Sequence, residues 1–308
     1  MTEPLKISLG IKSDPIEYRY TYEWLFRILA DEGVKYVQMG TFFEIYQLPD
    51  QWFVDLRKQA EDHGLQISSM FTAHRELGGF FREEPAFSEV AHNNFARLIE
   101  VGSLLGAAQV GSNPGAVMRD TMDYKDTGME NYIKHMNTPM THAKHQGLDY
   151  LTIEPMSCLA EPPTLPDEMR YMAEALMAYH HAHPEHTVPI GFCGDISHGY
   201  ANCDGNVIHS PQDLILASLP WLTELHLKNT DARFESTFGF DAQERERGII
   251  NLKEFKALLV DNQDQLPVDH LIAYLEIGGP KTGRDYSDAQ LESALRDSLQ
   301  HCKEVFEA

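Results

Sequence analysis

The chain has 308 residues, and its 25 basic and 47 acidic side chains give a formal net charge of −22. Such an acidic surface repels phosphate backbones and anionic lipid, which bind through basic contacts, so neither nucleic acid nor a membrane is expected as a partner. The chain has four cysteines, none in CxxC spacing, which is typical of a protein in the reducing cytoplasm. Its N-terminus lacks the basic and then apolar pattern of a signal peptide, so we expect a soluble cytoplasmic protein.

The first half of the chain alternates short apolar runs with amphipathic segments of helical period. The apolar runs predict strands at residues 5–11, 37–40, 65–71 and 107–113. The amphipathic segments predict helices at residues 18–30, 49–64, 85–106 and 131–147. Gly33 and Gly106 are expected to end the first and third helices, and Pro139 is expected to kink the fourth or to give it an irregular start.

The second half repeats the same pattern. Strands are predicted at residues 148–156, 188–195, 224–231 and 271–279. Helices are predicted at residues 166–183, 213–222, 250–264 and 288–306. Eight strand–helix units without a remainder predict an α/β protein whose residues 1–308 form one domain, a single (β/α)8 TIM barrel. A doubly wound open sheet is the alternative, but no GxGxxG follows the first strand, as its dinucleotide-binding form would require.

Three long non-periodic insertions follow predicted strands, at residues 113–130, 199–212 and 232–250. In a barrel, all three would lie on the face formed by the C-terminal ends of the strands. Barrel enzymes build their active sites on that face, so we expect the functional residues there.

Three carboxylates and one histidine stand near the ends of the last four predicted strands: Glu154, Asp195, His226 and Glu276. Each alone is more often a surface, capping or core residue. Together at one barrel mouth, the carboxylates would repel one another without a cation between them. An imidazole beside carboxylates favours Mn²⁺, with Mg²⁺, Co²⁺ and Zn²⁺ as further candidates. The pattern therefore predicts one divalent metal ion held by these four residues.

Each of these residues lies in a short motif: TIEP contains Glu154, DISHG contains Asp195, HLKNTD contains His226 and LEIGG contains Glu276. In this order, the motifs resemble those of the xylose-isomerase-like barrel superfamily, in particular the sugar and sugar-phosphate epimerases that include D-tagatose and D-psicose 3-epimerases. The stretch between His226 and Glu276 departs from the family, because it is longer than in a typical relative. This departure predicts an enlarged lid or a subunit contact in a homo-oligomer.

The resemblance implies a divalent-metal-dependent epimerase of a ketose or a ketose phosphate. An epimerase removes a proton beside a carbonyl and returns one on the other face, so two acid/base groups must flank the carbon. Glu154 and Glu276 are the implied pair, in addition to being metal ligands, and the metal would stabilise an enediolate. Asp195 and His226 would be ligands only. His198 and Arg233 would donate hydrogen bonds to substrate oxygens.

Further basic residues are candidates for substrate binding. Lys228 alternates onto the same strand face as His226, so it is expected to point into the mouth. Lys281 and Arg284 follow the eighth strand in a glycine-rich turn, where barrels often bind phosphate, although an ordinary turn explains them as well. His74 follows the third strand and would reach the substrate unless its loop is simply solvated.

Several alternative functions remain open on the same residues. An aldose–ketose isomerase would use a second metal and more carboxylates, of which only Asp231 is apparent. An inosose-type dehydratase would share the metal ligands. An AP endonuclease would need three zinc ions and a basic DNA-binding face, which the net charge of −22 disfavours. A non-catalytic binding barrel would not need two opposed carboxylates. The sequence does not name the sugar or its phosphorylation state.

Overall fold

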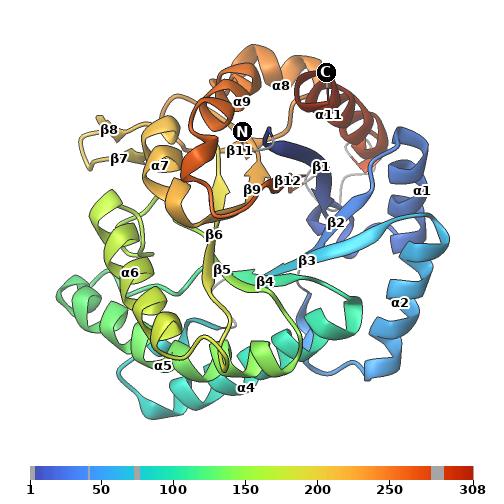
Figure 1. The fold of residues 1–308 in the computed structure, drawn as a ribbon. Helices are drawn as coiled ribbons and strands as arrows, with labels where there is room; N and C mark the ends of the chain where they lie inside the picture. Colours follow the sequence, from blue (N-terminus) through green and yellow to red (C-terminus); the bar gives the residue numbers. More distant parts are fainter. Residues whose placement is uncertain (1–3, 41, 73–76, 279–287, 308) are drawn as a thin grey trace.

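Eight parallel strands close into a barrel in the computed structural model, which describes residues 4–40, 42–72, 77–278 and 288–307 (Figure 1). Around the barrel the strands follow one another as β1, β2, β3, β4, β5, β6, β9 and β12, and β12 closes against β1. Their bounds are β1 Lys6–Lys12, β2 Tyr36–Met39, β3 Gln66–Thr72, β4 Gln109–Ser112, β5 Tyr150–Ile153, β6 Ile190–Asp195, β9 Leu222–Leu227 and β12 His270–Leu275. The predicted (β/α)8 TIM barrel is confirmed.

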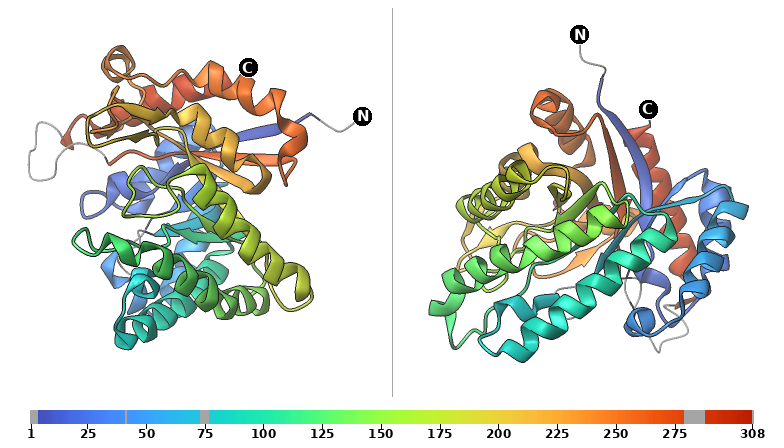
Figure 2. Two further views of the ribbon diagram at one scale, coloured as in Figure 1. Left: turned by 90° about the vertical axis from the view of Figure 1, so that its left-hand side faces the viewer. Right: turned by 60° about the horizontal axis from the view of Figure 1, so that its bottom comes forward.

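Helices surround the barrel as an outer ring, which the views of Figure 2 show from two further directions. The main helices are α1 Tyr22–Glu32, α2 Asp50–Asp62, α4 Pro85–Leu105, α5 Lys125–His145, α6 Pro166–Ala182, α7 Pro211–Ser218, α9 Leu252–Asp261 and α11 Leu291–Phe306. Two small antiparallel pairs and a short helix lie in the connections after β6 and β9: β7 Tyr200–Ala201 with β8 Val207–His209, β10 Asn229–Thr230 with β11 Thr237–Phe238, and α8 Ala242–Arg247.

Helix ends follow local chemistry. Gly33 and Gly106 end α1 and α4 with positive φ angles of 69° and 79°, a conformation that glycine adopts without steric cost. Thr21 caps the start of α1 by accepting the Trp24 backbone N–H at 3.2 Å. This cap explains why α1 begins at Tyr22, four residues later than predicted.

Helix α5 differs most from the prediction. It begins at Lys125 rather than at 131, so the last part of the predicted 113–130 insertion is helical, and Pro139 lies inside it rather than at its start. Gly128 disfavours a helix by propensity alone. However, Gly128 packs closely against Phe81, because a Cβ at this position would lie 2.7 Å from the ring. Tertiary packing therefore outweighs local propensity here.

Three barrel strands, among them the two that contain Asp195 and His226, are buried on both faces. Every residue of β4, β6 and β9 is buried, as expected for parallel strands that have helices outside and side chains inside the barrel. The four cysteines are free. None of the described helices is long and apolar enough to cross a lipid bilayer.

Candidate metal centre

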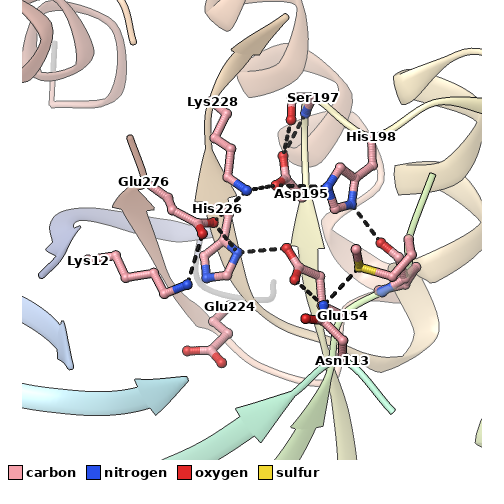
Figure 3. Close-up of polar contacts among 12 residues, drawn as sticks. Lys12, Asn113, Glu154, Asp195, Ser197, His198, Glu224, His226, Lys228 and Glu276 are labelled. Carbon is pink, nitrogen blue, oxygen red and sulfur yellow. Dashed lines mark hydrogen bonds and ion pairs between the residues drawn. The ribbon is translucent and has the colours of Figure 1, made fainter. Parts of the chain in front are cut away.

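Glu154, Asp195, His226 and Glu276 meet at the mouth of the barrel, at the C-terminal ends of β5, β6, β9 and β12 (Figure 3). Strand register places Asp195 beside His226 and Glu276 just beyond it. Asp195 pairs with His226 across β6 and β9, and the Glu276 backbone N–H donates to Leu227 just above His226. One ligand atom from each residue lies within 4.8 Å of the others, so the group can hold a single metal ion.

The donor set fits a divalent cation. The four residues offer three carboxylates and one imidazole, which suit Mn²⁺, Co²⁺ or Zn²⁺ better than Ca²⁺. Asp195 Oδ2 and Glu276 Oε2 are buried on either side of one ammonium group, Lys228 Nζ, which lies 2.9 Å from each. A metal ion held by the cluster would give both carboxylate oxygens a second partner.

His226 presents one ring nitrogen to the carboxylates and the other to the barrel interior. Its Nδ1 lies 2.9 Å from Glu154 Oε1 and 2.7 Å from Glu276 Oε2. Its Nε2 lies 2.7 Å from Gln38 Oε1, which can only accept a hydrogen bond, so Nε2 is the donor. Nδ1 is therefore the atom that faces the proposed metal position.

Two lysines flank Glu276 from the neighbouring strands. Lys12, the last residue of β1, places Nζ 2.8 Å from Glu276 Oε1 and 3.0 Å from Asp14. Lys228, just after β9, places Nζ 2.9 Å from Glu276 Oε2 and 2.9 Å from Asp195 Oδ2. Burial alone would raise the pKa of Glu276, but His226, Lys12 and Lys228 hold it well below its usual range.

Glu154 has a different environment. Its Oε2 accepts a hydrogen bond from the neutral Asn113 side chain at 2.5 Å, while Oε1 faces His226. Burial would raise the pKa of Glu154, but His226 and, less strongly, Lys228 lower it. The two candidate acid/base carboxylates are therefore not equivalent, because ammonium groups contact Glu276 directly, whereas an amide contacts Glu154.

Asp195 is fixed by the turn that follows β6. Its Oδ1 accepts the Ser197 backbone N–H at 2.8 Å and the Ser197 hydroxyl at 2.7 Å, which leaves Oδ2 directed at the cluster. His198 Nε2 lies 3.4 Å from Oδ2, and His198 Nδ1 lies 2.7 Å from the Pro155 carbonyl, to which it donates. Burial would raise the pKa of Asp195, but His198 and Lys228 hold it well below its usual range.

A family model described as a xylose isomerase-like TIM barrel matches residues 26–304 of the chain. The chain belongs to this family. No curated protein sequence matches it.

Solved structures of this barrel family resemble the chain over nearly its full length. D-Psicose 3-epimerase with D-tagatose from Clostridium cellulolyticum H10 has a TM-score of 0.72 and 14% identity, covering 98% of this chain and 100% of that one. D-Psicose 3-epimerase in the presence of D-fructose has a TM-score of 0.69 and 15% identity, covering 98% and 100%. The probable 3-DHS dehydratase AsbF from Bacillus anthracis has a TM-score of 0.62 and 12% identity, covering 95% and 97%. At these identities the resemblance establishes the fold.

The residues predicted to bind substrate in this xylose isomerase-like barrel do not all lie at the metal cluster. Lys228 points into the mouth, as its alternation with His226 indicated, and His198 lies beside Asp195. Arg233 is exposed in the loop after β9, where its backbone N–H donates to Asp231. His74, Lys281 and Arg284 lie outside the described residues, so their substrate contacts stay predictions.

Four residues near the ligands were missed from the sequence: Lys12, Gln38, Asn113 and Glu224. Lys12 and Asn113 stand at strand ends, where polar residues are ordinary. Gln38 and Glu224 stand inside buried strands, and a polar side chain at such a position was a usable signal.

Proposed function

We propose that this xylose isomerase-like barrel is an enzyme, a divalent-metal-dependent epimerase of a ketose or ketose phosphate. Mn²⁺ is the proposed metal, with Mg²⁺, Co²⁺ or Zn²⁺ as substitutes. The observation that carries the proposal is the placement of Glu154 and Glu276 on either side of His226 Nδ1, at 2.9 and 2.7 Å. Their strands, β5 and β12, are separated in the barrel by β6 and β9, so the two carboxylates approach from different directions.

This arrangement suits proton transfer on both faces of one carbon. A bound divalent metal would polarise the substrate carbonyl and favour the enediolate. One carboxylate takes the proton from the carbon beside the carbonyl, and the other, in its protonated form, returns a proton to the opposite face. The net change is inversion at that carbon, with no change in composition. Lys12 and Lys228 offset the negative charge that the three carboxylates and the enediolate bring together.

The isomerase and dehydratase alternatives differ in the metal ligands that they need. A two-metal isomerase needs a further free carboxylate. Asp231 accepts hydrogen bonds from Arg233 and Glu235 N–H on Oδ1 and from the Ser236 hydroxyl on Oδ2, all within its own loop. A dehydratase on the same four ligands is the second candidate, and the likeness to AsbF favours keeping it.

Proton–deuterium exchange tests the proposed function. The Mn²⁺-loaded protein is incubated in D₂O with a panel of ketoses and ketose phosphates and followed by NMR. We expect deuterium at carbon 3 together with the carbon-3 epimer. Formation of an aldose, with or without deuterium at its carbon 2, would establish an isomerase, and loss of water from a keto-polyol would establish a dehydratase. If a free ketose and its phosphate exchange equally well, the predicted phosphate-binding role of Lys281 and Arg284 is wrong.

Metal affinity should rise with pH. Burial alone would lower the pKa of His226, but Cys193 and the carboxylates of Glu276 and Glu154 raise it well above its usual value. The imidazolium must lose its Nδ1 proton before this nitrogen can bind a metal, whereas the carboxyl pKa values of the other ligands are lowered. Below the raised pKa of His226, affinity should therefore increase about tenfold per pH unit.

Chelator competition with Mn²⁺ between about pH 6 and about pH 8 measures this dependence, because most carboxylates stay ionised over that range. A flat profile would mean that no proton leaves a ligand on binding. The Asp231→Asn variant should show the same slope as the parent, because Asp231 lies outside the cluster.

A further inference from the structure

Three side chains point into the barrel at successive depths, two from β9 and one from just after it. Glu224, His226 and Lys228 alternate along the chain, so they share one face, and Figure 3 shows Glu224 beneath His226 and on the opposite side from Lys228. Lys228 reaches the mouth, His226 joins the metal cluster, and Glu224 lies deeper, with no exposed surface. The proposed proton transfer does not use Glu224. A buried carboxylate that takes no part in the chemistry requires an explanation.

Glu224 is surrounded by hydrogen-bond donors. The Thr152 hydroxyl donates to its Oε1 at 2.8 Å, and Gln38 Nε2 donates to its Oε2 at 3.1 Å. Ser69 adds a further side-chain hydrogen bond to the carboxyl and accepts one from Gln38 Nε2 at 3.2 Å. Burial raises the pKa of Glu224, whereas these hydrogen bonds favour the ionised form. The three partners come from β2, β3 and β5, so the contacts span the interior of the barrel.

These contacts give the Gln38 side chain one orientation. Its amino group faces two acceptors, Glu224 Oε2 and Ser69 Oγ, so its carbonyl oxygen must face the other way. That oxygen lies 2.7 Å from His226 Nε2. Since a carbonyl oxygen only accepts, Nε2 must carry a proton, and Nδ1 is the ring nitrogen whose lone pair can face the carboxylates and the metal.

We propose that Glu224 and Gln38 are positioning residues that hold His226 in the Nε2–H tautomer and so keep Nδ1 available as a metal ligand. Glu224 acts through Gln38, and neither residue touches the metal or the substrate. The inference rests on the metal-binding role proposed for His226, but not on the identity of the sugar. Outer hydrogen-bond partners of this kind orient ligating histidines and raise their basicity.

The Glu224→Gln variant tests the inference with little change in shape. A neutral amide can donate as well as accept, so the Gln38 side chain is free to turn over and offer its amino group to His226 Nε2. This would favour a proton on Nδ1, which then cannot bind metal. Gln38→Leu removes the acceptor altogether. We expect Mn²⁺ affinity, measured by chelator competition without any substrate, to fall about 10- to 100-fold in both variants.

A matched control comes from the same barrel interior. Tyr274 OH lies 2.8 Å from Ser68 Oγ, both are buried, and neither contacts His226 or Gln38 through a side-chain hydrogen bond in the described part of the chain. Tyr274→Phe removes a buried hydroxyl whose hydrogen-bond partner is Ser68 rather than a metal ligand or Gln38, so it should leave metal affinity close to that of the parent. An equal loss of affinity in this variant would overturn the positioning role.

A second variant and a spectroscopic measurement keep the inference testable if Glu224→Gln does not fold. Thr152→Val keeps the carboxylate but removes one of its donors, and it should lower affinity by a smaller factor than Gln38→Leu. At a pH above the raised pKa of His226, histidine ¹⁵N spectra of the metal-free protein should show the Nε2–H tautomer for His226 in the parent and an added Nδ1–H population in Glu224→Gln. Unchanged affinity and an unchanged tautomer in these variants would refute the inference. Absence of exchange with any ketose would refute only the proposed function.

Discussion

Replacing Glu154 or Glu276 by Gln should lower the rate of epimerisation by about 10²- to 10⁴-fold, the range that a positioned acid or base contributes. Gln keeps an oxygen donor for the metal but cannot accept a proton. Inversion needs both carboxylates, because one group cannot reach both faces of a carbon. Each single variant should therefore fail to invert, even where one remaining carboxylate still removes a proton.

Substrate deuterium exchange separates these two steps. A variant that keeps one working base should exchange the substrate proton on one face without forming the epimer. Glu32→Gln is the matched control, since this carboxylate pairs with Arg296 at 2.7 Å at the end of α1, away from the mouth, and its loss should leave the rate unchanged. Full epimerase activity in either Glu154→Gln or Glu276→Gln would rule out the two-base mechanism.

Asp195→Asn should abolish stable metal binding, and activity should disappear with it. Ser197 fixes Oδ1, so the single remaining oxygen, Oδ2, is the one that faces the cluster. Asn keeps the size of the side chain but removes its charge, and it would leave the Lys228 ammonium 2.9 Å away without that partner. We expect Mn²⁺ to bind at least about 100-fold more weakly, a loss typical of a damaged ligand set.

Elemental analysis after dialysis measures this effect directly. The parent should retain about one metal ion per chain, as expected for a site with one set of ligands, and Asp195→Asn should retain almost none. The Asp231→Asn variant should behave like the parent, because its carboxylate is used within its own loop. Three zinc ions per chain in the parent would contradict the single-metal site and would favour the endonuclease alternative.

The barrel and the four candidate ligands could be predicted because each leaves a local signal. A strand–helix unit is visible in hydrophobic periodicity, and an acidic residue at the end of an apolar strand stands out against its neighbours. The start of α5 could not be read in this way, since Gly128 is tolerated there only because it packs against Phe81, a contact between segments far apart in the chain.

The partners of the ligands were harder to predict for a related reason. Lys12 contacts Glu276 because the first strand pairs with the last, as the predicted barrel requires. A polar residue at a strand end is ordinary, however, so nothing near Lys12 in the sequence marked it as part of the site. Glu224 is different. The alternation that placed Lys228 on the His226 face places Glu224 on that face too, so its position inside the barrel was predictable. Its contact with Gln38 was not, because β2 and β9 are not neighbours in the sheet.

The closure of β12 against β1 also sets the order in which the site can form. Glu276 follows β12, the last of the eight barrel strands to be synthesised, and β12 reaches its place only when it pairs with both β1 and β9. During synthesis, the chain can therefore offer Glu154, Asp195 and His226 well before the fourth ligand exists. Full metal affinity should appear only once the barrel has closed, so metal uptake would report this closing step of folding.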